Sequence, residues 1–191
     1  MPKKQPLMLQ KFKTSIAYTR NLFVTGALSQ TCRSVEIEIC RHITKDDYKI
    51  IVEFGMGHGN ITREILNNMA SNSKLYAFEV NKSFCEQVRN AIADNRLIIV
   101  NDSAENIKKH IQSDVHSVIS SIPFSFFSKQ KQVGIIQDVY DKLVKESYFS
   151  QVLYTKGSFK KFQKLFDACH IEKIKDNIPT AYIYHCKKEA I

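Results

Sequence analysis

The chain has 191 residues, 43% of them hydrophobic and 10% aromatic, which fits one globular domain with a substantial core. No apolar run approaches the ~20 residues that a membrane-spanning helix needs, and the N-terminus lacks the continuous apolar stretch of a signal peptide. The net charge of +9 suggests a polyanionic partner, either nucleic acid or an anionic lipid surface, with simple solubility as the alternative.

Five cysteines are scattered along the chain: Cys32, Cys40, Cys85, Cys169 and Cys186. Their number is odd and no two of them form a C-x-x-C pair. We therefore expect reduced thiols in the cytosol, with neither structural disulfides nor a metal site.

The first 30 residues differ in charge from the rest of the chain. All charged residues before Glu36 are Lys or Arg, and apolar side chains recur among them at roughly helical spacing: Leu9, Phe12, Ile16, Phe23 and Ala27. This pattern is typical of a basic amphipathic helix on an anionic membrane, and equally of a helix packed on the domain with its basic side outward. We treat residues 1–30 as this segment and 31–191 as the main domain.

The remaining chain alternates between strand and helix patterns. Strands are predicted at 50–54, 75–79, 96–100, 115–121 and 148–154, with helices at 35–43, 61–69, from Asn81 onward, 131–144 and 158–169, and two closing strands at 171–174 and 181–186. The alternation predicts an α/β fold with a parallel sheet covered by helices on both faces. The last two strands predict an antiparallel hairpin.

A glycine-rich turn follows the first strand. Gly55, Gly57 and Gly59 alternate with other residues immediately before the next predicted helix. Glycine accepts positive φ and lets a ligand approach the backbone, and the start of a helix favours an anionic group. A single residue separates the second and third glycines, whereas the dinucleotide-binding motif G-x-G-x-x-G has two residues there.

Polar residues also follow the other predicted strands. Glu79 ends the second strand about 20 residues beyond the last glycine, Asp102 follows the third, and Ser120 to Phe124 follow the fourth. Ligands of open α/β sheets bind at the carboxyl ends of the strands, so we predict that these loops converge on one crevice. Asp102 is also expected to cap the helix after it.

This arrangement resembles the class I S-adenosylmethionine (SAM)-dependent methyltransferases. The resemblance implies a Rossmann-like, seven-stranded, mostly parallel sheet and SAM as cofactor. It implies that the glycine loop packs on the methionine part of SAM, that Glu79 binds the ribose hydroxyls, and that Asp102 accepts from the adenine amino group. The cofactor-binding residues are then Thr31, Glu53, Gly55, Gly57, Gly59, Glu79, Val80, Asp102, Ser103, Ala104 and Ser120.

Within that class, the chain is similar to bacterial phospholipid N-methyltransferases. Gly26 to Arg33 is like their Gly-Ala-x-x-Pro-Ser-Ser-Arg, Ser120 to Pro123 like their Ser-Gly-Leu-Pro, and Asn177 to Ala181 like their Asn-Leu-Pro-Pro-Ala. Several residues depart from the family's pattern: Gln30, Thr31, Cys32, His58, Ser121 and Thr180. The rRNA adenine dimethylases, which share the architecture, carry Asn-Leu-Pro-Tyr in the fourth-strand loop, whose Asn and Tyr this chain lacks.

The resemblance implies methylation of phosphatidylethanolamine or a related amino lipid, with no metal, by a cytoplasmic enzyme peripheral to the inner face of the membrane. Ser120 and Pro123 are then the catalytic candidates, and Ile122, Phe124 and Tyr154 the substrate contacts. Two alternatives stay open. One is an RNA adenine N-methyltransferase, favoured by the positive charge. The other is a lipid- or RNA-surface binding protein without catalysis, against which the intact acidic residues and glycines weigh.

Overall fold

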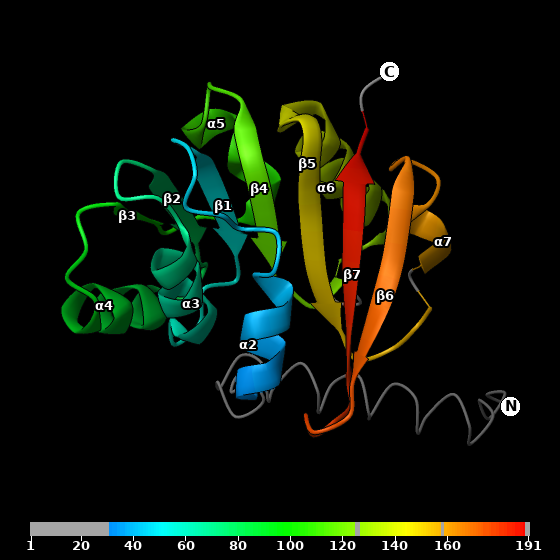
Figure 1. Ribbon diagram of the computed structural model, residues 1–191, viewed down its shortest axis with the longest axis horizontal. Coiled ribbons are helices and arrows are strands. Elements are labelled where there is room, and N and C mark those ends of the chain that lie inside the picture. Colours follow the sequence, from blue (N-terminus) through cyan, green and yellow to red (C-terminus); the bar gives the residue numbers. More distant parts are fainter. Residues whose placement is uncertain (1–30, 125–126, 158, 190–191) are drawn as a thin grey trace, which may run out of the picture. The chain divides into compact units, whose positions relative to one another are not determined.

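The computed structural model describes residues 31–124, 127–157 and 159–189, so the predicted basic segment 1–30 lies outside the described residues. The described strands form one seven-stranded sheet in the order β3-β2-β1-β4-β5-β7-β6 (Figure 1). The strands are β1 (Ile50–Phe54), β2 (Lys74–Phe78), β3 (Leu97–Val100), β4 (Val115–Ser120), β5 (Leu143–Leu153), β6 (Ala168–Ile174) and β7 (Ala181–Lys188). The helices are α2 (Arg33–Ile39), α3 (Asn60–Asn68), α4 (Lys82–Ala91), η1 (Ala104–Asn106), α5 (Ile107–His110), α6 (Lys129–Lys142) and α7 (Phe159–Phe162).

The pairing of the strands confirms the predicted fold class. β1 pairs in parallel with β2 and β4, and β3 and β5 extend the parallel part on either side. β7 then runs antiparallel between β5 and β6. The sheet is therefore mostly parallel and ends in the antiparallel hairpin that the last two apolar runs predicted.

Helices cover both faces of the sheet because alternate strand residues are buried on opposite sides. On one face, α2 and α3 pack in a cluster that includes Ile51 of β1. On the other, α5 and α6 pack in a cluster that includes Val52. Both residues are completely buried, as the continuous apolar run of β1 predicted.

The spacing of apolar residues identifies the core face of α3 fully and that of α6 only in part. Ile61, Ile65, Leu66 and Met69 are all buried. On α6, Val133 is 61% exposed and Gln132 is buried in its place. Gln132 is held by polar contacts that apolar periodicity does not reveal: its amide donates to the carbonyl of Phe127, and its oxygen accepts from Lys161.

The predicted helix at 158–169 is wrong. Helix α7 ends at Phe162, and the chain is already in β6 at Ala168. Phe162 and Phe166 are spaced as on a helix, and both are buried against Phe149. From Ala168 onward, pairing with β7 replaces helical hydrogen bonds, a long-range effect that local spacing does not show.

None of the described helices has the length and apolar character required to cross a membrane. η1 and α5 form the helical segment expected after Asp102, but no range was predicted for either because each is too short for a periodic signal.

Gly59 provides a test of the glycine loop's packing. Its φ is +82°, and an added Cβ would lie 3.1 Å from Val88 Cγ2 and 3.2 Å from Ile92 Cδ1. We expect Gly59→Ala to lower the free energy of unfolding by about 1–3 kcal/mol, from left-handed backbone strain plus crowding against α4. Urea unfolding followed by circular dichroism measures this.

Two other glycines serve as controls. Gly57 has φ +53° and open space around its Cβ position, so Gly57→Ala carries the strain alone and should cost about 1 kcal/mol. Gly134 lies in α6 with open space, so Gly134→Ala should stabilise by up to about 1 kcal/mol. A Gly59→Ala protein as stable as Gly57→Ala would contradict this packing.

Candidate cofactor and substrate site

The carboxyl ends of the four central strands meet at one edge of the sheet. Phe54 is level with Phe78 and with Ser120, and Phe78 is level with Val100. Backbone hydrogen bonds continue this register into the loops: the Gly55 amide donates to the Phe78 carbonyl at 2.9 Å, and the Ser121 amide to the Phe54 carbonyl at 2.9 Å. The convergence predicted for these loops is confirmed.

The three glycines after β1 all have positive φ, but their surroundings differ. A Cβ on Gly55 would lie 3.0 Å from Ile122 Cγ2 and 3.1 Å from Ser121 Oγ. Gly55 therefore lets the β4 loop approach, and Gly59 lets α4 approach. A Cβ on Gly57 would meet none of the described residues within 4 Å. Of the three, Gly57 alone borders open space, where a ligand can lie against the backbone.

Glu79 joins the β2 end to this loop. Its Oε2 accepts from the Gly57 amide at 3.0 Å, and its Oε1 accepts from the Asn81 amide at 2.8 Å. Asn81 caps α4 as predicted, because its side chain accepts from the Ser83 amide. Each carboxylate oxygen keeps a second lone pair, so Glu79 is still able to accept from a ligand's hydroxyls. Val80, beside it, is 71% exposed.

Asp102 follows β3 and is held by three donors. Its Oδ1 accepts from the Ser103 amide (2.7 Å) and from Asn106 Nδ2 (2.8 Å), and its Oδ2 lies 2.8 Å from His110 Nε2. The contact with His110, followed by those with Asn106 and Ser103, lowers the pKa of Asp102 to about 2. The carboxyl is therefore ionised at neutral pH.

The prediction that Asp102 caps the next helix is wrong, since the cap is Ser103, whose hydroxyl accepts from the Glu105 amide. Ala104 is buried beneath this turn. His110, on α5, was not identified from the sequence as a partner of Asp102.

Glu53 lies under the glycine loop and is 1% exposed. Its Oε2 accepts from Thr62 Oγ1 of α3 at 2.7 Å, and its Oε1 has no partner among the described residues. Burial, with a smaller contribution from the charge of Glu79, raises the pKa of Glu53 to about 8. The carboxyl is therefore mostly protonated at neutral pH and joins β1 to α3; its contact with a cofactor stays a prediction.

The β4 loop is fixed from both sides. Ser121 Oγ donates to the Gly55 carbonyl at 2.6 Å, and Gln151 Nε2 donates to the Ile122 carbonyl at 3.0 Å. Ser120 is fully buried, and its hydroxyl has no partner among the described residues. Pro123 and Ile122 are partly buried.

Gln151 was missed by the sequence analysis. It is fully buried in β5, level with Ser120 of β4. The sequence signal was a glutamine within a predicted strand, between Phe149 and Val152, because an amide buried among such residues must find polar partners. Its two donated bonds, to the carbonyls of Ile122 and Val152, account for its place.

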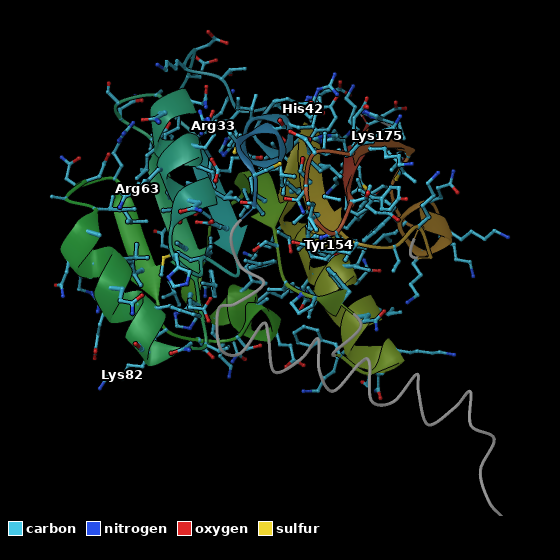
Figure 2. All side chains as sticks on the ribbon, turned by 90° about the horizontal axis from the view of Figure 1, so that it is seen from below. Arg33, His42, Arg63, Lys82, Tyr154 and Lys175 are labelled. Atoms are coloured by element: carbon cyan, nitrogen blue, oxygen red, sulfur yellow. The ribbon has the colours of Figure 1, made fainter. Side chains whose placement is uncertain are left out.

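Phe124, one of the predicted substrate contacts, lies in the core. It is 2% exposed, and its ring packs edge-on against Phe162 at 6.0 Å and near Phe127 at 6.4 Å. Phe162 of α7 and Phe127 thus surround the ring, and its contact with a substrate stays a prediction. Tyr154 immediately follows β5 and is partly buried (Figure 2).

Two segments that carried the resemblance to phospholipid N-methyltransferases meet in the structure. The amide of Cys32 donates to Asn177 Oδ1 at 3.0 Å, across 145 sequence positions. Asn177 is 4% exposed, and its own amide donates to the Pro179 carbonyl at 2.7 Å. β7 runs antiparallel to β5, with Tyr182 level with Leu153, so this loop lies at the carboxyl edge of β5.

Thr31, partly buried, precedes this contact, and Arg33 follows it. Arg33, labelled in Figure 2, forms ion pairs with Glu36 at 3.1 Å and Glu64 at 2.5 Å. The beginning of α2 is thereby attached to α3 as well as to the β6–β7 loop.

No family model matches the chain. It is 22% identical over 153 residues to the ornithine lipid N-methyltransferase of Singulisphaera acidiphila, covering 77% of this chain and 80% of that protein. Among solved structures, it is similar to a precorrin-6y C5,15-methyltransferase from Geobacter metallireducens, with 15% identity, a TM-score of 0.68, and coverage of 83% of this chain and 91% of that one.

Two further solved structures are similar in fold. An rRNA methylase from Streptococcus thermophilus has 14% identity and a TM-score of 0.63, with 84% and 98% of the two chains covered. SMU.1697c from Streptococcus mutans, solved in complex with SAH, has 15% identity and a TM-score of 0.64, with 83% and 98% covered. The fold is that of the class I SAM-dependent methyltransferases, as the resemblance implied.

The described site fits SAM. Among the described residues, open space borders Gly57, the Glu79 carboxylate accepts from the Gly57 amide, and α3 begins three residues further on at Asn60. A helix start and backbone amides suit the carboxylate of an amino acid, and a glutamate suits ribose hydroxyls. No group of three or more His, Cys, Asp or Glu able to hold a metal occurs in the described part of the chain.

Glu53 predicts a pH dependence of stability. Between about pH 4.5 and 8 the folded protein keeps a proton on Glu53 that the unfolded chain has lost, so the free energy of unfolding should fall as pH rises through this range and then level off. Glu53→Gln keeps an acceptor for Thr62 and removes this dependence. The free energy of unfolding is measured with denaturant at pH 5 and pH 8. Relative to the wild type, that of the variant should be higher at pH 8 than at pH 5, by about a few kcal/mol at most.

Glu86→Gln is the control, because Glu86 is exposed on α4 beside Lys82. Its stability should follow the wild type at both pH values. Parallel curves for wild type and Glu53→Gln would show that Glu53 is ionised in the folded protein.

Proposed function

We propose that this protein is a SAM-dependent N-methyltransferase that methylates the amine of a phospholipid, phosphatidylethanolamine or a related amino lipid. The observation that carries the proposal is the bond between the Cys32 amide and Asn177 at the edge of the candidate site. It joins the two segments that resemble phospholipid N-methyltransferases in particular. The similarity to an ornithine lipid N-methyltransferase supports the same substrate class.

The cofactor would lie over the glycine loop. Gly57 leaves room for its methionine part, Glu79 accepts from its ribose hydroxyls, and Val80 with the Asp102–Ala104 turn holds its adenine. When bound, SAM supplies an electrophilic methyl group on its sulfonium sulfur. Because Glu79 already holds the Gly57 amide, the loop is pre-organised before the cofactor arrives.

The β4 loop would hold the amine. Methyl transfer needs the amine's lone pair about 3 Å from the methyl carbon and in line with the departing sulfur. Pro123 restricts the loop backbone, and Gln151 fixes the carbonyl of Ile122, whose second lone pair is able to accept from the amine N–H. The buried Ser120 hydroxyl, which has no partner among the described residues, lies at the end of the same strand and remains the second catalytic candidate.

Residues 1–30 are proposed to bring the enzyme to an anionic membrane as a peripheral protein. Each cation close to an anionic surface contributes about 1 kcal/mol. Burial of Phe12 and Phe23 in the interface adds about 25 cal/mol per Å² of apolar surface. Such binding is reversible and weakened by salt.

An RNA adenine N-methyltransferase is the second candidate, because solved structures of similar fold include an rRNA methylase and the net charge is +9. Two observations count against it. The β4 loop has no Asn or Tyr at its ends, and the Phe124 ring is buried against Phe162 instead of facing a base. A binding protein without catalysis would not require the glycine loop, Glu79 and Asp102 together.

The cofactor assignment predicts that Gly57→Val and Glu79→Ala each weaken SAM binding at least tenfold. The valine fills the open space beside the loop, and the alanine removes both the ribose acceptor and the bond to the Gly57 amide. Isothermal titration calorimetry measures the affinity, and circular dichroism checks folding. Glu86→Ala, an exposed acid of α4, should bind like the wild type. Unchanged affinity in both site variants would contradict the assignment.

The substrate proposal predicts where a labelled methyl group goes. SAM carrying a radiolabelled methyl is offered in parallel to total lipid and total RNA, and label should enter amino lipids. Pro123→Ala should lower the turnover severalfold with little change in SAM affinity. Label in RNA and none in lipid would favour the second candidate, and label in neither would favour a non-catalytic binding protein.

Presenting the same lipid in vesicles or in detergent separates membrane binding by residues 1–30 from methyl transfer itself. Phe12→Ala combined with Phe23→Ala should reduce transfer to amino lipid in anionic vesicles but not to the same lipid dispersed in detergent. Equal transfer to vesicles by this variant and the wild type would contradict the membrane role of residues 1–30.

A further inference from the structure

Two cysteines face each other across the last two strands of the sheet. Cys169 of β6 is directly level with Cys186 of the antiparallel β7. Both are free thiols. β6 is the edge strand of the sheet, the orange arrow beside the red β7 in Figure 1. This thiol pair takes no part in the candidate methyl-transfer site.

The strand geometry suits a covalent link. Residues directly opposite in an antiparallel pair have Cα atoms about 4.5–5.5 Å apart, within the span of about 4.4–6.8 Å that disulfides bridge. Because the two residues are directly opposite, their side chains lie on the same face of the hairpin. Linking Cys169 to Cys186 therefore requires side-chain rotation and no change in the register of the strands.

The two thiols differ in access and acidity. Cys169 is partly exposed at the sheet edge, whereas Cys186 is fully buried in the core. The hydrogen bond from Cys186 lowers the pKa of the Cys169 thiol, and burial raises the pKa of Cys186. This asymmetry is the one that a reacting and a resolving thiol require, because the thiolate attacks an oxidant and the second thiol closes the disulfide.

The other cysteines of the chain are placed differently. Cys40 and Cys85 are buried in separate clusters around α2 and α4, and Cys32 precedes α2. Nor do Cys169 and Cys186 belong to a metal centre, since no metal-holding group of three or more His, Cys, Asp or Glu was found among the described residues.

We propose that Cys169 and Cys186 are a modification site at which a peroxide forms a reversible intramolecular disulfide. The Cys169 thiolate attacks one peroxide oxygen and the O–O bond breaks, which leaves a sulfenic acid on Cys169 and, after proton uptake, one water. The sulfur of Cys186 then attacks the sulfur of Cys169. The S–O bond breaks, the S–S bond forms, and the thiol proton leaves with the oxygen as a second water. A small dithiol reductant reverses the step by thiol–disulfide exchange.

The disulfide would close the hairpin that carries Asn177. The segment between the two cysteines includes the β6–β7 loop that holds the Cys32 amide at the start of α2. A link between β6 and β7 restricts the unfolded chain and keeps the edge strand in the sheet. Oxidation is therefore expected to stabilise the hairpin without altering the glycine loop.

The test uses the full chain, purified under reducing conditions and then treated with hydrogen peroxide. Mass spectrometry of non-reduced tryptic peptides should find a Cys169–Cys186 cross-link two hydrogen masses below the free peptides, and titration should show two fewer free thiols. The thermal unfolding midpoint should rise, and dithiothreitol should reverse all three changes. None of these readouts depends on methyl transfer, so the outcome stands apart from the proposed function.

Two variants complete the test. Cys186→Ala should lose the cross-link and leave sulfenic or sulfinic acid on Cys169, while Cys85→Ala, a matched buried cysteine elsewhere, should form the cross-link like the wild type. Absence of the cross-link in wild type would overturn the proposal. So would cross-links only between molecules, or an unfolding midpoint that falls on oxidation because the link strains the hairpin.

Discussion

The contact between the loops after β1 and β4 is the constraint on which the site depends. Gly55 approaches Ser121 and Ile122 so closely that a methyl group would lie about as near as 3.0 Å to a neighbouring carbon. The Ser121 hydroxyl and the Ser121 amide both bind the backbone of residues 54 and 55. Two strand ends that must otherwise diverge into separate loops are thereby held together.

From this contact the arrangement extends in both directions across the sheet. Toward β2 and β3, Glu79 holds the Gly57 amide, and Asn101 donates to the Glu79 carbonyl at 2.8 Å. Toward β5, Gln151 holds the Ile122 carbonyl. The loops around the candidate site are therefore linked by hydrogen bonds between polar groups, while the apolar clusters on the two faces hold the sheet beneath them. A site built in this way is rigid before a ligand binds, which reduces the entropy lost on binding.

Much of the parallel sheet and of the cofactor loop could be predicted from the sequence, because the residues that define them lie close together along the chain. A buried strand, alternate glycines and a helix start lie within a dozen residues, and Glu79 is placed by the next strand in register. What escaped prediction depends on partners far away along the chain. Gln151 is explained by a carbonyl 29 positions earlier, Phe124 is buried by the ring of Phe162, and β6 begins where β7 can pair with it. Short elements such as α5, with its His110, have too few residues for a periodic signal.

The order of β6 and β7 in the sequence and in the sheet has a consequence for how the sheet forms during synthesis. β6 is made before β7, yet its neighbour in the sheet is β7, which alone separates it from β5. While residues 181–188 are still inside the ribosome, β6 has no place in the sheet, β5 is left as an open edge, and Asn177 is not yet held near α2. An open edge strand is a template for pairing with other chains. The emergence of β7 is thus the step that brings β6 into the sheet, and a chain stopped before Ala181 lacks two strands of the sheet although only one is missing from its sequence.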